Sequence, residues 1–146
     1  YTDSTMRILI KTIRVSVGKA GTETPTGTWT MHRAGRWQEL MGPSWGQYGT
    51  HVVNGIFVHS VACGQANSYN LPVGEYLRLG NPASHGCIRA CVADAKWVWD
   101  NCNGSKIHIF DGTYTSNEAL KGPLGRKALT PLRGSKNFDP TDPACK

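Results

Sequence analysis

A thiol and an imidazole lie two positions apart in the stretch Ser84-His85-Gly86-Cys87-Ile88-Arg89. A cysteine nucleophile needs a base that accepts its proton, N–H groups that face the oxyanion it creates, and space for a substrate to approach. Gly86 leaves that space, and the amides of Gly86 and Cys87 are natural oxyanion donors. The base is either His85 or a histidine that the fold brings from elsewhere. We therefore expect this stretch to carry the chemistry of the protein.

A second histidine, His59, follows an apolar run in Gly55-Ile56-Phe57-Val58-His59-Ser60. In this order the two stretches resemble the signature of the catalytic domain of bacterial L,D-transpeptidases, the YkuD-like family. Three further segments are similar to motifs of that family: Val15 to Lys19, Thr24 to Trp29, and Asp94 to Gly104. A resemblance in family order over about residues 13 to 110 is far more specific than one short motif.

The resemblance implies a mechanism through a cysteine acyl-enzyme. Cys87 would attack the carbonyl of a stem-peptide residue as a thiolate, expel D-Ala and pass the acyl group to the amine of a second stem. His59 would be the base, held by the main chain or side chain of Ser60. His85 would help to shape the site, and Gly86 would contribute to the oxyanion site. A cysteine paired with His59 would have a lowered pKa.

The predicted substrate contacts lie in two places. Arg89 would hold a substrate carboxylate in its planar fork, although many family members carry Asn at this position. Ser84 is the second contact in this stretch. Residues 33 to 50 lack a helix or strand period and indicate an irregular surface segment, near which the resemblance places the family's substrate-covering flap. Its aromatic side chains Trp45 and Tyr48 either contact substrate or pack on the edge of the core.

Three functions fit these residues. The first is an L,D-transpeptidase that forms 3-3 cross-links in peptidoglycan, and the second is an L,D-carboxypeptidase, in which water replaces the acceptor amine. The third, a non-catalytic wall-binding module, has no need of Cys87 beside His85 and Gly86. We predict no cofactor and no metal, because His59, His85 and Cys87 form an irregular ligand set without an obvious fourth ligand. The resemblance also implies peptidoglycan stem peptides as partners and carbapenem β-lactams as inhibitors.

Composition indicates a globular protein whose positive charge either favours anionic surroundings such as wall polymers or serves solubility alone. Hydrophobic residues make up 39% of the chain and charged residues 18%, and the net charge is +6. The Lys and Arg residues are scattered, which does not favour nucleic acid. No apolar run approaches the length of a membrane span, and the N-terminus has no signal-peptide pattern. Either an export segment was removed or the protein never had one. The resemblance implies a place outside the cytoplasm, in the wall or at the cell surface.

The five cysteines predict no zinc site, because no Cys-x-x-Cys pair is present. If Cys87 stays free, the remaining cysteines, Cys63, Cys91, Cys102 and Cys145, can form up to two disulfides or remain buried thiols. Cys91 and Cys102 are not expected to form a disulfide with each other, because a helix between them would hold them too far apart.

The sequence predicts several strands and one main helix. Strands are expected at 13–17, 28–32 and 106–110, and 51–59 is read as two short strands joined at Asn54-Gly55 or as one bulged strand. Residues 94–101 form the main helix, with Gly104 as its stop signal. We therefore expect a mostly β, two-sheet sandwich-like fold with one main helix after the nucleophile. The chain is expected to form a single domain, 1–146, with a core at about 7–110 and a wrapping tail at 111–146.

Overall fold

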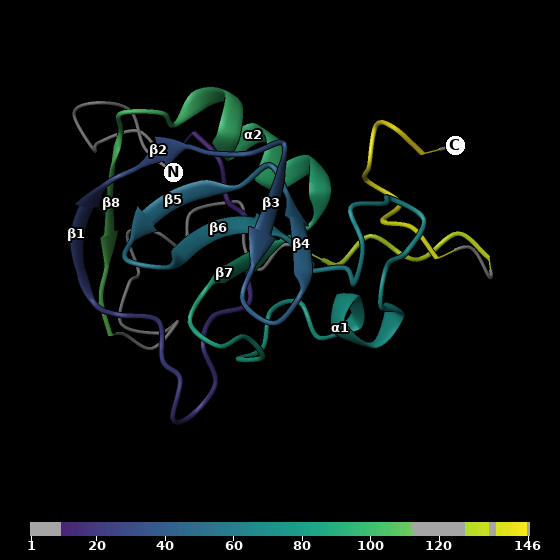
Figure 1. Ribbon diagram of the computed structural model, residues 1–146, viewed down its shortest axis with the longest axis horizontal. Helices are drawn as coiled ribbons and strands as arrows, with labels where there is room; N and C mark the ends of the chain where they lie inside the picture. The colour runs from purple at the N-terminus through teal and green to yellow at the C-terminus, as the bar shows by residue number, and fades with distance from the viewer. Residues whose placement is uncertain (1–9, 112–127, 135–136, 146) are drawn as a thin grey trace.

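The computed structural model describes residues 10–111, 128–134 and 137–145 (Figure 1). Its elements are, in order, β1 (Gly27–Thr30), β2 (His32–Arg33), β3 (Trp37–Leu40), β4 (Ser44–Gln47), β5 (Thr50–Val53), β6 (Ile56–Ser60), α1 (Val73–Leu77), β7 (Ile88–Ala90), α2 (Val92–Asn101) and β8 (Lys106–Ile109). The mostly β prediction is confirmed. The main helix lies where the sequence predicts it, directly after the nucleophile stretch.

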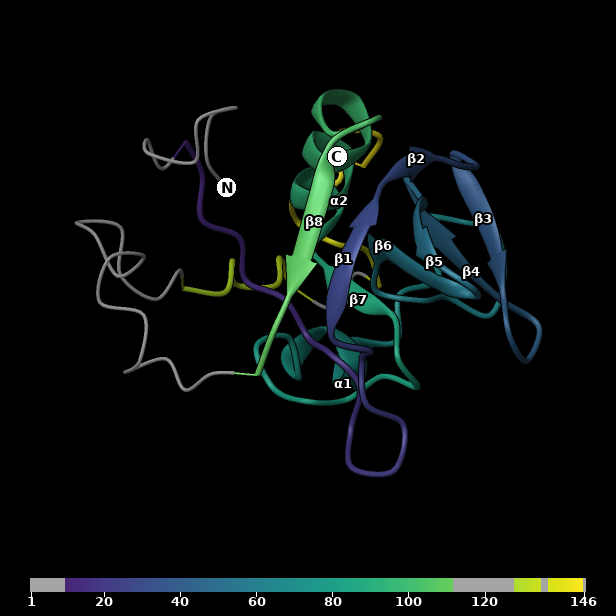
Figure 2. The same ribbon diagram turned by 90° about the vertical axis from the view of Figure 1, so that its left-hand side faces the viewer.

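A mixed four-stranded sheet in the order β2-β5-β6-β7 forms the centre of the fold. β6 pairs with β7 in parallel, which aligns His59 with Arg89, and the other pairs are antiparallel. Two-stranded sheets, β1-β8 and β3-β4, bring the described residues to three sheets where two were expected. Figure 2 shows β1 and β8 side by side, with the β3–β4 hairpin on the other side of the central sheet. The parallel pair β6–β7 therefore joins the two stretches that the sequence predicts to carry the chemistry.

The helix α2 covers one side of the central sheet. Val92, Ala95 and Val98 recur at three-residue spacing, so they lie on one buried face of the helix. Val98 packs in the main core cluster, whose buried members are Met31, Val52, Val58, Ile88, Val98 and Cys102. Because Ile88 follows the nucleophile directly and is only 8% exposed, this core holds the start of β7 in place.

Two predictions about local structure need correction, and one segment between the motifs has structure of its own. Residues 33 to 50 are not irregular: they contain β3 and β4, joined by a turn in which Gly42 has φ +71°. Residues 60–83, which connect the stretch ending in Ser60 to the nucleophile stretch, contain the short helix α1. The predicted strand 13–17 is reduced to a bridge between Ser16 and Arg89, followed by another between Gly18 and Ser84. The sequence does not reveal the β3–β4 hairpin, because each of its strands is only four residues long and Gly and Pro residues interrupt the alternating pattern.

The described end of the chain docks on α2 and on β4. Asp139 Oδ2 accepts a hydrogen bond from Val92 N at 2.8 Å, at the first residue of a helix whose N-cap, Cys91, makes no side-chain capping bond. Asp142 Oδ2 accepts one from Gln47 Nε2 at 2.8 Å. Residues 137–145 thus contact the rest of the domain, whereas 112–127, 135–136 and 146 of the predicted tail lie outside the described residues, and the wrapping tail stays a prediction. Cys145, one of the cysteines that could have formed a disulfide, is not bridged.

Replacement of Asp139 by Ala is expected to destabilise the protein by about 1–3 kcal/mol, because it leaves a buried amide at the start of α2 without its acceptor. The free energy of unfolding from urea titration measures the loss. Asp100→Ala, on the exposed side of the same helix, is the matched control and should have a much smaller effect. Equal stability of Asp139→Ala and the parent would show that the tail does not secure α2.

Candidate active site

The nucleophile loop is held by hydrogen bonds between its own residues. Ser84 Oγ donates to Cys87 O at 2.6 Å and accepts from Gly86 N at 3.1 Å. Gly86 has φ +119°, and a Cβ at this position would lie 2.8 Å from Ile56 Cδ1, so the loop requires glycine here. The Gly86 amide is therefore engaged by Ser84, which corrects its predicted role as a free oxyanion donor. Ser84 is fully buried and acts as a brace of the loop.

Residues 18–24, which precede β1, support this loop through hydrogen bonds. Thr24 Oγ1 accepts a hydrogen bond from Gly18 N at 2.9 Å and donates one to Gly86 O at 2.7 Å. Thr22 Oγ1 donates to Ser84 O at 3.1 Å. The threonine hydroxyls of this motif thus connect two segments that lie more than sixty positions apart in the chain.

His59 lies at the buried end of β6 in a fixed tautomer. Its Nδ1 is bonded to the main-chain oxygen of Ser60. Because a carbonyl can only accept, Nδ1 carries the hydrogen and Nε2 keeps its lone pair, as a general base requires. The hydroxyl of Ser60 instead accepts from Gln47 N at 2.9 Å and donates to Val61 O at 3.1 Å. Ser60 therefore orients the histidine through its main chain.

Gly46 on β4 is a site residue that the sequence analysis missed. A Cβ built on Gly46 would lie 2.6 Å from Nδ1 of His59 and 2.8 Å from its Cγ. The β3–β4 hairpin therefore lies directly against the imidazole, and only glycine allows this approach. A Trp-Gly-Gln sequence in a region without clear period gives no signal of such a contact, since the partner is distant in sequence.

The structure changes the expected protonation state of Cys87 but agrees with His59 as a neutral base. Burial lowers the pKa of His59 to about 4, with a smaller contribution in the same direction from the positive charge of Arg89, whereas the hydrogen bond to Ser60 opposes the shift. Burial also raises the pKa of Cys87, although its contact with Phe57 and the charge of Arg89 oppose this. The expected lowered pKa of Cys87 is thus wrong for the resting state. At neutral pH the site holds a thiol and a neutral imidazole.

Alkylation of Cys87 by iodoacetamide should accelerate about tenfold per pH unit between pH 5 and 8, since the thiolate fraction rises steadily below a raised pKa. No inflection should occur near pH 6.5, because His59 is already neutral above about pH 4. Peptide mass mapping at each pH measures the rate. A rate that is constant from pH 5 to 8 would instead indicate a preformed thiolate–imidazolium pair.

Arg89 is held in place by Glu75, an acidic residue of α1. Its Nη1 lies 2.7 Å from Glu75 Oε2 on α1 and 3.5 Å from Ala83 O. Its Nε is buried without a hydrogen-bond partner among the described residues. Glu75 also pairs with Arg78 at 3.1 Å. The guanidinium thus reaches the cleft while its charge is matched by Glu75, so the predicted contact with a substrate carboxylate would compete with this pair.

One cleft collects most of the predicted site residues. It has a volume of about 350 Å³ and is lined by Glu39, Leu40, Met41, Ser44, Gly55, Ile56, Phe57, His59, Ala62, Ser84, His85, Cys87 and Arg89. His85 is exposed at its rim, whereas Cys87 is half-buried, with Sγ 3.6 Å from Gly55 O. The cleft thus joins the nucleophile loop, the end of β6 and the β3–β4 hairpin.

The two aromatic residues predicted as substrate contacts lie outside this lining. Tyr48 is 6% exposed and packs in a core cluster with Ala90, and its ring meets Trp99 edge to face at 5.7 Å. Its predicted contact with substrate does not fit that position. Trp45 pairs with Cys63 through backbone hydrogen bonds at 2.7 and 2.8 Å. The cleft instead takes Leu40, Met41 and Ser44 from the same hairpin.

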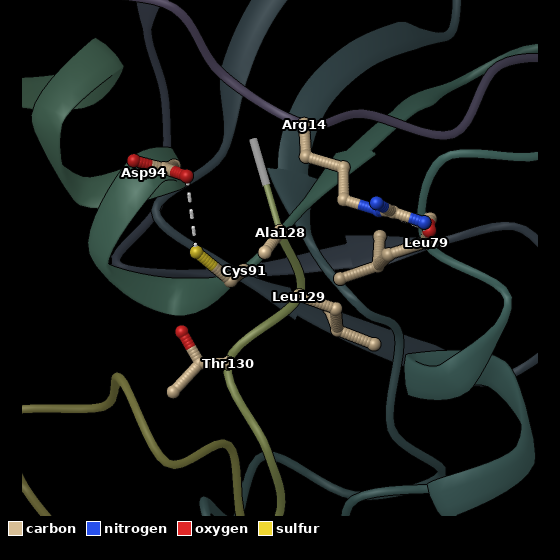
Figure 3. Close-up of a pocket in the computed structure, with 7 residues that line it drawn as sticks. All are labelled: Arg14, Leu79, Cys91, Asp94, Ala128, Leu129 and Thr130. Carbon is tan, nitrogen blue, oxygen red and sulfur yellow. Dashed lines mark hydrogen bonds between the residues drawn. The ribbon is translucent and has the colours of Figure 1, made fainter. Parts of the chain in front are cut away.

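The other cysteines offer no competing site. None of the five forms a disulfide in the part of the chain that the structure describes. Cys91 lines a cavity of only about 10 Å³ (Figure 3), room for a single water molecule at most, and its Sγ donates to Asp94 Oδ2 at 3.2 Å. Burial raises the pKa of Cys91 and of Cys63 to about 11. Within the described ranges, no three His, Cys, Asp or Glu side chains are grouped as a metal site, and no helix is long and apolar enough to cross a membrane.

Comparison with known structures agrees with this architecture. An L,D-transpeptidase from Mycobacterium tuberculosis H37Rv is 23% identical, with a TM-score of 0.53 over 68% of this chain and 42% of that chain. One from Stackebrandtia nassauensis is 21% identical, with a TM-score of 0.51 over 68% and 44%. The transpeptidase LdtMt1 in complex with imipenem is 23% identical, with a TM-score of 0.53 over 72% and 51%. The chain thus spans about half or less of these structures, and they show that the fold is shared.

Sequence comparison identifies the family. YciB of Bacillus subtilis (strain 168) is 59% identical over 27 residues, which are 18% of this chain and 14% of that protein. The model of the L,D-transpeptidase catalytic domain family, YkuD, matches residues 1–122. This match contains the nucleophile loop, the buried histidine and the motif that braces them. The chain therefore belongs to the L,D-transpeptidase catalytic domain family.

Proposed function

We propose that the protein forms 3-3 cross-links in peptidoglycan by acyl transfer through Cys87. The observation that carries the proposal is the oriented imidazole: Nδ1 of His59 is bound to the Ser60 carbonyl, while His59 and Cys87 line the same cleft. The net charge of +6 supports a place among anionic wall polymers, outside the cytoplasm.

In the acylation step, Nε2 of His59 accepts the thiol proton as Sγ of Cys87 bonds to the carbonyl carbon of the third stem residue. The carbonyl oxygen becomes the oxyanion, for which the Cys87 amide is the proposed donor because the Gly86 amide is engaged by Ser84. Collapse of this intermediate breaks the bond to D-Ala, whose nitrogen takes the proton from His59. A thioester and free D-Ala result.

In the transfer step, the amine of a second stem attacks the thioester carbonyl. His59 accepts a proton from this amine, the carbon–sulfur bond breaks, and Cys87 recovers the proton. The resting neutral pair fits this sequence, since the thiol loses its proton only when a carbonyl is in place. A neutral imidazole is available as a base in both steps.

The experiment is incubation of the protein with tetrapeptide stems that end in D-Ala, followed by mass spectrometry of the products. A dimer linked between two third residues, together with free D-Ala, is the expected result. Tripeptide and D-Ala without dimer would instead make the protein an L,D-carboxypeptidase. Unchanged stems with folded protein would leave the wall-binding module as the function.

A further inference from the structure

The segment between β6 and the nucleophile stretch places a carboxylate on the one strong cation of the cleft. Arg89 is the only Lys or Arg among the described residues that line the cleft. It is aligned with His59 in the register of β6 and β7, and its side chain is only 15% exposed. Oε2 of Glu75 lies 2.7 Å from its Nη1. Because the pair is close and shielded from water, Glu75 offsets much of the charge that Arg89 presents to a ligand.

The ion pair leaves one nitrogen of the guanidinium open. Nη1 of Arg89 bonds to Glu75 and lies 3.5 Å from Ala83 O. Nε is buried without a partner among the described residues, whereas Nη2 also has no described partner but is not buried. A guanidinium carries five N–H donors in one plane and can bind two carboxylates through different nitrogens. Nη2 is therefore the atom through which Arg89 can bind an anion from the cleft.

Glu75 has a second cationic partner outside the cleft. Its Oε1 lies 3.1 Å from Nη1 of Arg78, one turn further along the chain. The side chain of Arg78 is 66% exposed and does not line the cleft. Glu75 thus keeps one ion pair even when another carboxylate contacts Arg89, so an exchange of partners at Arg89 does not leave it without a countercharge.

The donor stem of the proposed reaction supplies such a carboxylate. Its terminal D-Ala carries a carboxylate one residue beyond the carbonyl that Cys87 attacks, and this group is ionised at neutral pH. Arg89 follows Cys87 by only two positions, and both residues line the cleft. Two carboxylates on one guanidinium repel each other. Glu75 and the terminal carboxylate therefore oppose each other's binding to Arg89.

We propose that Glu75 competes with the terminal carboxylate of the donor stem for Arg89, and thereby weakens the binding of the donor and of the D-Ala that it releases. This inference rests on the proposed function. D-Ala takes the carboxylate with it and must leave the cleft before an acceptor amine reaches the thioester. Without Glu75, Arg89 would bind this carboxylate more tightly and delay its release.

The test measures the Kd of two tetrapeptide stems by titration calorimetry at pH 7, one ending in D-Ala and one in D-alaninamide. Cys87→Ala is the background, because it prevents turnover. Glu75→Gln on this background should lower the Kd of the stem with the free carboxylate about three- to tenfold, since it removes the competing charge and keeps the side-chain shape. The Kd of the amidated stem should not change, which also shows that the cleft is intact.

Asp100→Asn is the matched control, because it also removes a carboxylate from an ion pair within a helix, but outside the cleft. It should leave both Kd values unchanged. A higher Kd of the carboxylate stem in Glu75→Gln would mean that Glu75 instead positions Arg89 for binding, and would overturn the inference. An unchanged Kd, or an equal change for both stems, would overturn it as well.

Failure of the proposed function has a different signature. Release of D-Ala by the protein that retains Cys87 tests acyl transfer separately from the Kd values. Stems that bind with the expected response to Glu75→Gln but release no D-Ala would overturn the proposed function and support the competition at Arg89. Folded protein that binds neither stem would overturn both.

Discussion

His59→Ala is expected to lower kcat/KM for acyl transfer by about 10²- to 10⁴-fold, because it removes the only buried imidazole in the cleft among the described residues. Its Nδ1 bond to Ser60 shows that the ring is oriented for proton transfer at Nε2. His85→Ala should cost far less, since His85 is exposed at the rim. Steady-state release of D-Ala from a tetrapeptide stem measures both variants.

The comparison requires that both variants fold, which circular dichroism and thermal unfolding establish. His85→Ala serves as the matched control, because it also removes an imidazole from the same cleft. A loss at His85 equal to or larger than the loss at His59 would assign the base to the residue next to the nucleophile. The oriented imidazole of His59 would then be structural.

Gly46→Ala is expected to reduce acyl transfer by about 10²-fold or more, although no reacting atom is changed. A methyl group 2.6 Å from Nδ1 of His59 cannot be accommodated, so either the imidazole or the hairpin must move. A displacement of about 1 Å in a catalytic group commonly costs this much. D-Ala release measures the loss.

The matched control is Gly74→Ala on α1, where an added Cβ meets nothing within 4 Å. It should retain activity and gain slightly in stability, because alanine favours a helix. Activity of Gly46→Ala close to that of the parent would mean that the hairpin can withdraw from His59 without consequence. The hairpin would then not be needed to position the base.

The sequence motifs point to Cys87 and His59 as the proposed reactive groups, because both residues occur in short, ordered segments. Cys87 and His59 line one cleft, as their place in the two motifs predicts. The helix after the nucleophile was equally visible, since its apolar residues recur with helical spacing and Gly104 marks its end. Such signals are local, so they can be recognised in the sequence without knowledge of the tertiary fold.

The residues that tune the site could not be predicted in this way. Gly46 matters because of a partner thirteen positions away on another strand, and no local pattern reports that contact. Tyr48 is an aromatic residue of the kind that often contacts a ligand, but it packs in the core. The pKa of Cys87 depends on burial, which overrides the simple expectation from a neighbouring histidine. Each of these features depends on tertiary packing.

The central claim, that Cys87 forms an acyl-enzyme, is tested most directly by intact-protein mass spectrometry with imipenem. This β-lactam is bound in the LdtMt1 structure that shares the fold. We expect one adduct per chain, located by peptide mapping on the segment that contains Cys87 and absent in Cys87→Ala. Folded parent protein without an adduct, or with the adduct on Cys63, Cys91, Cys102 or Cys145, would contradict the claim.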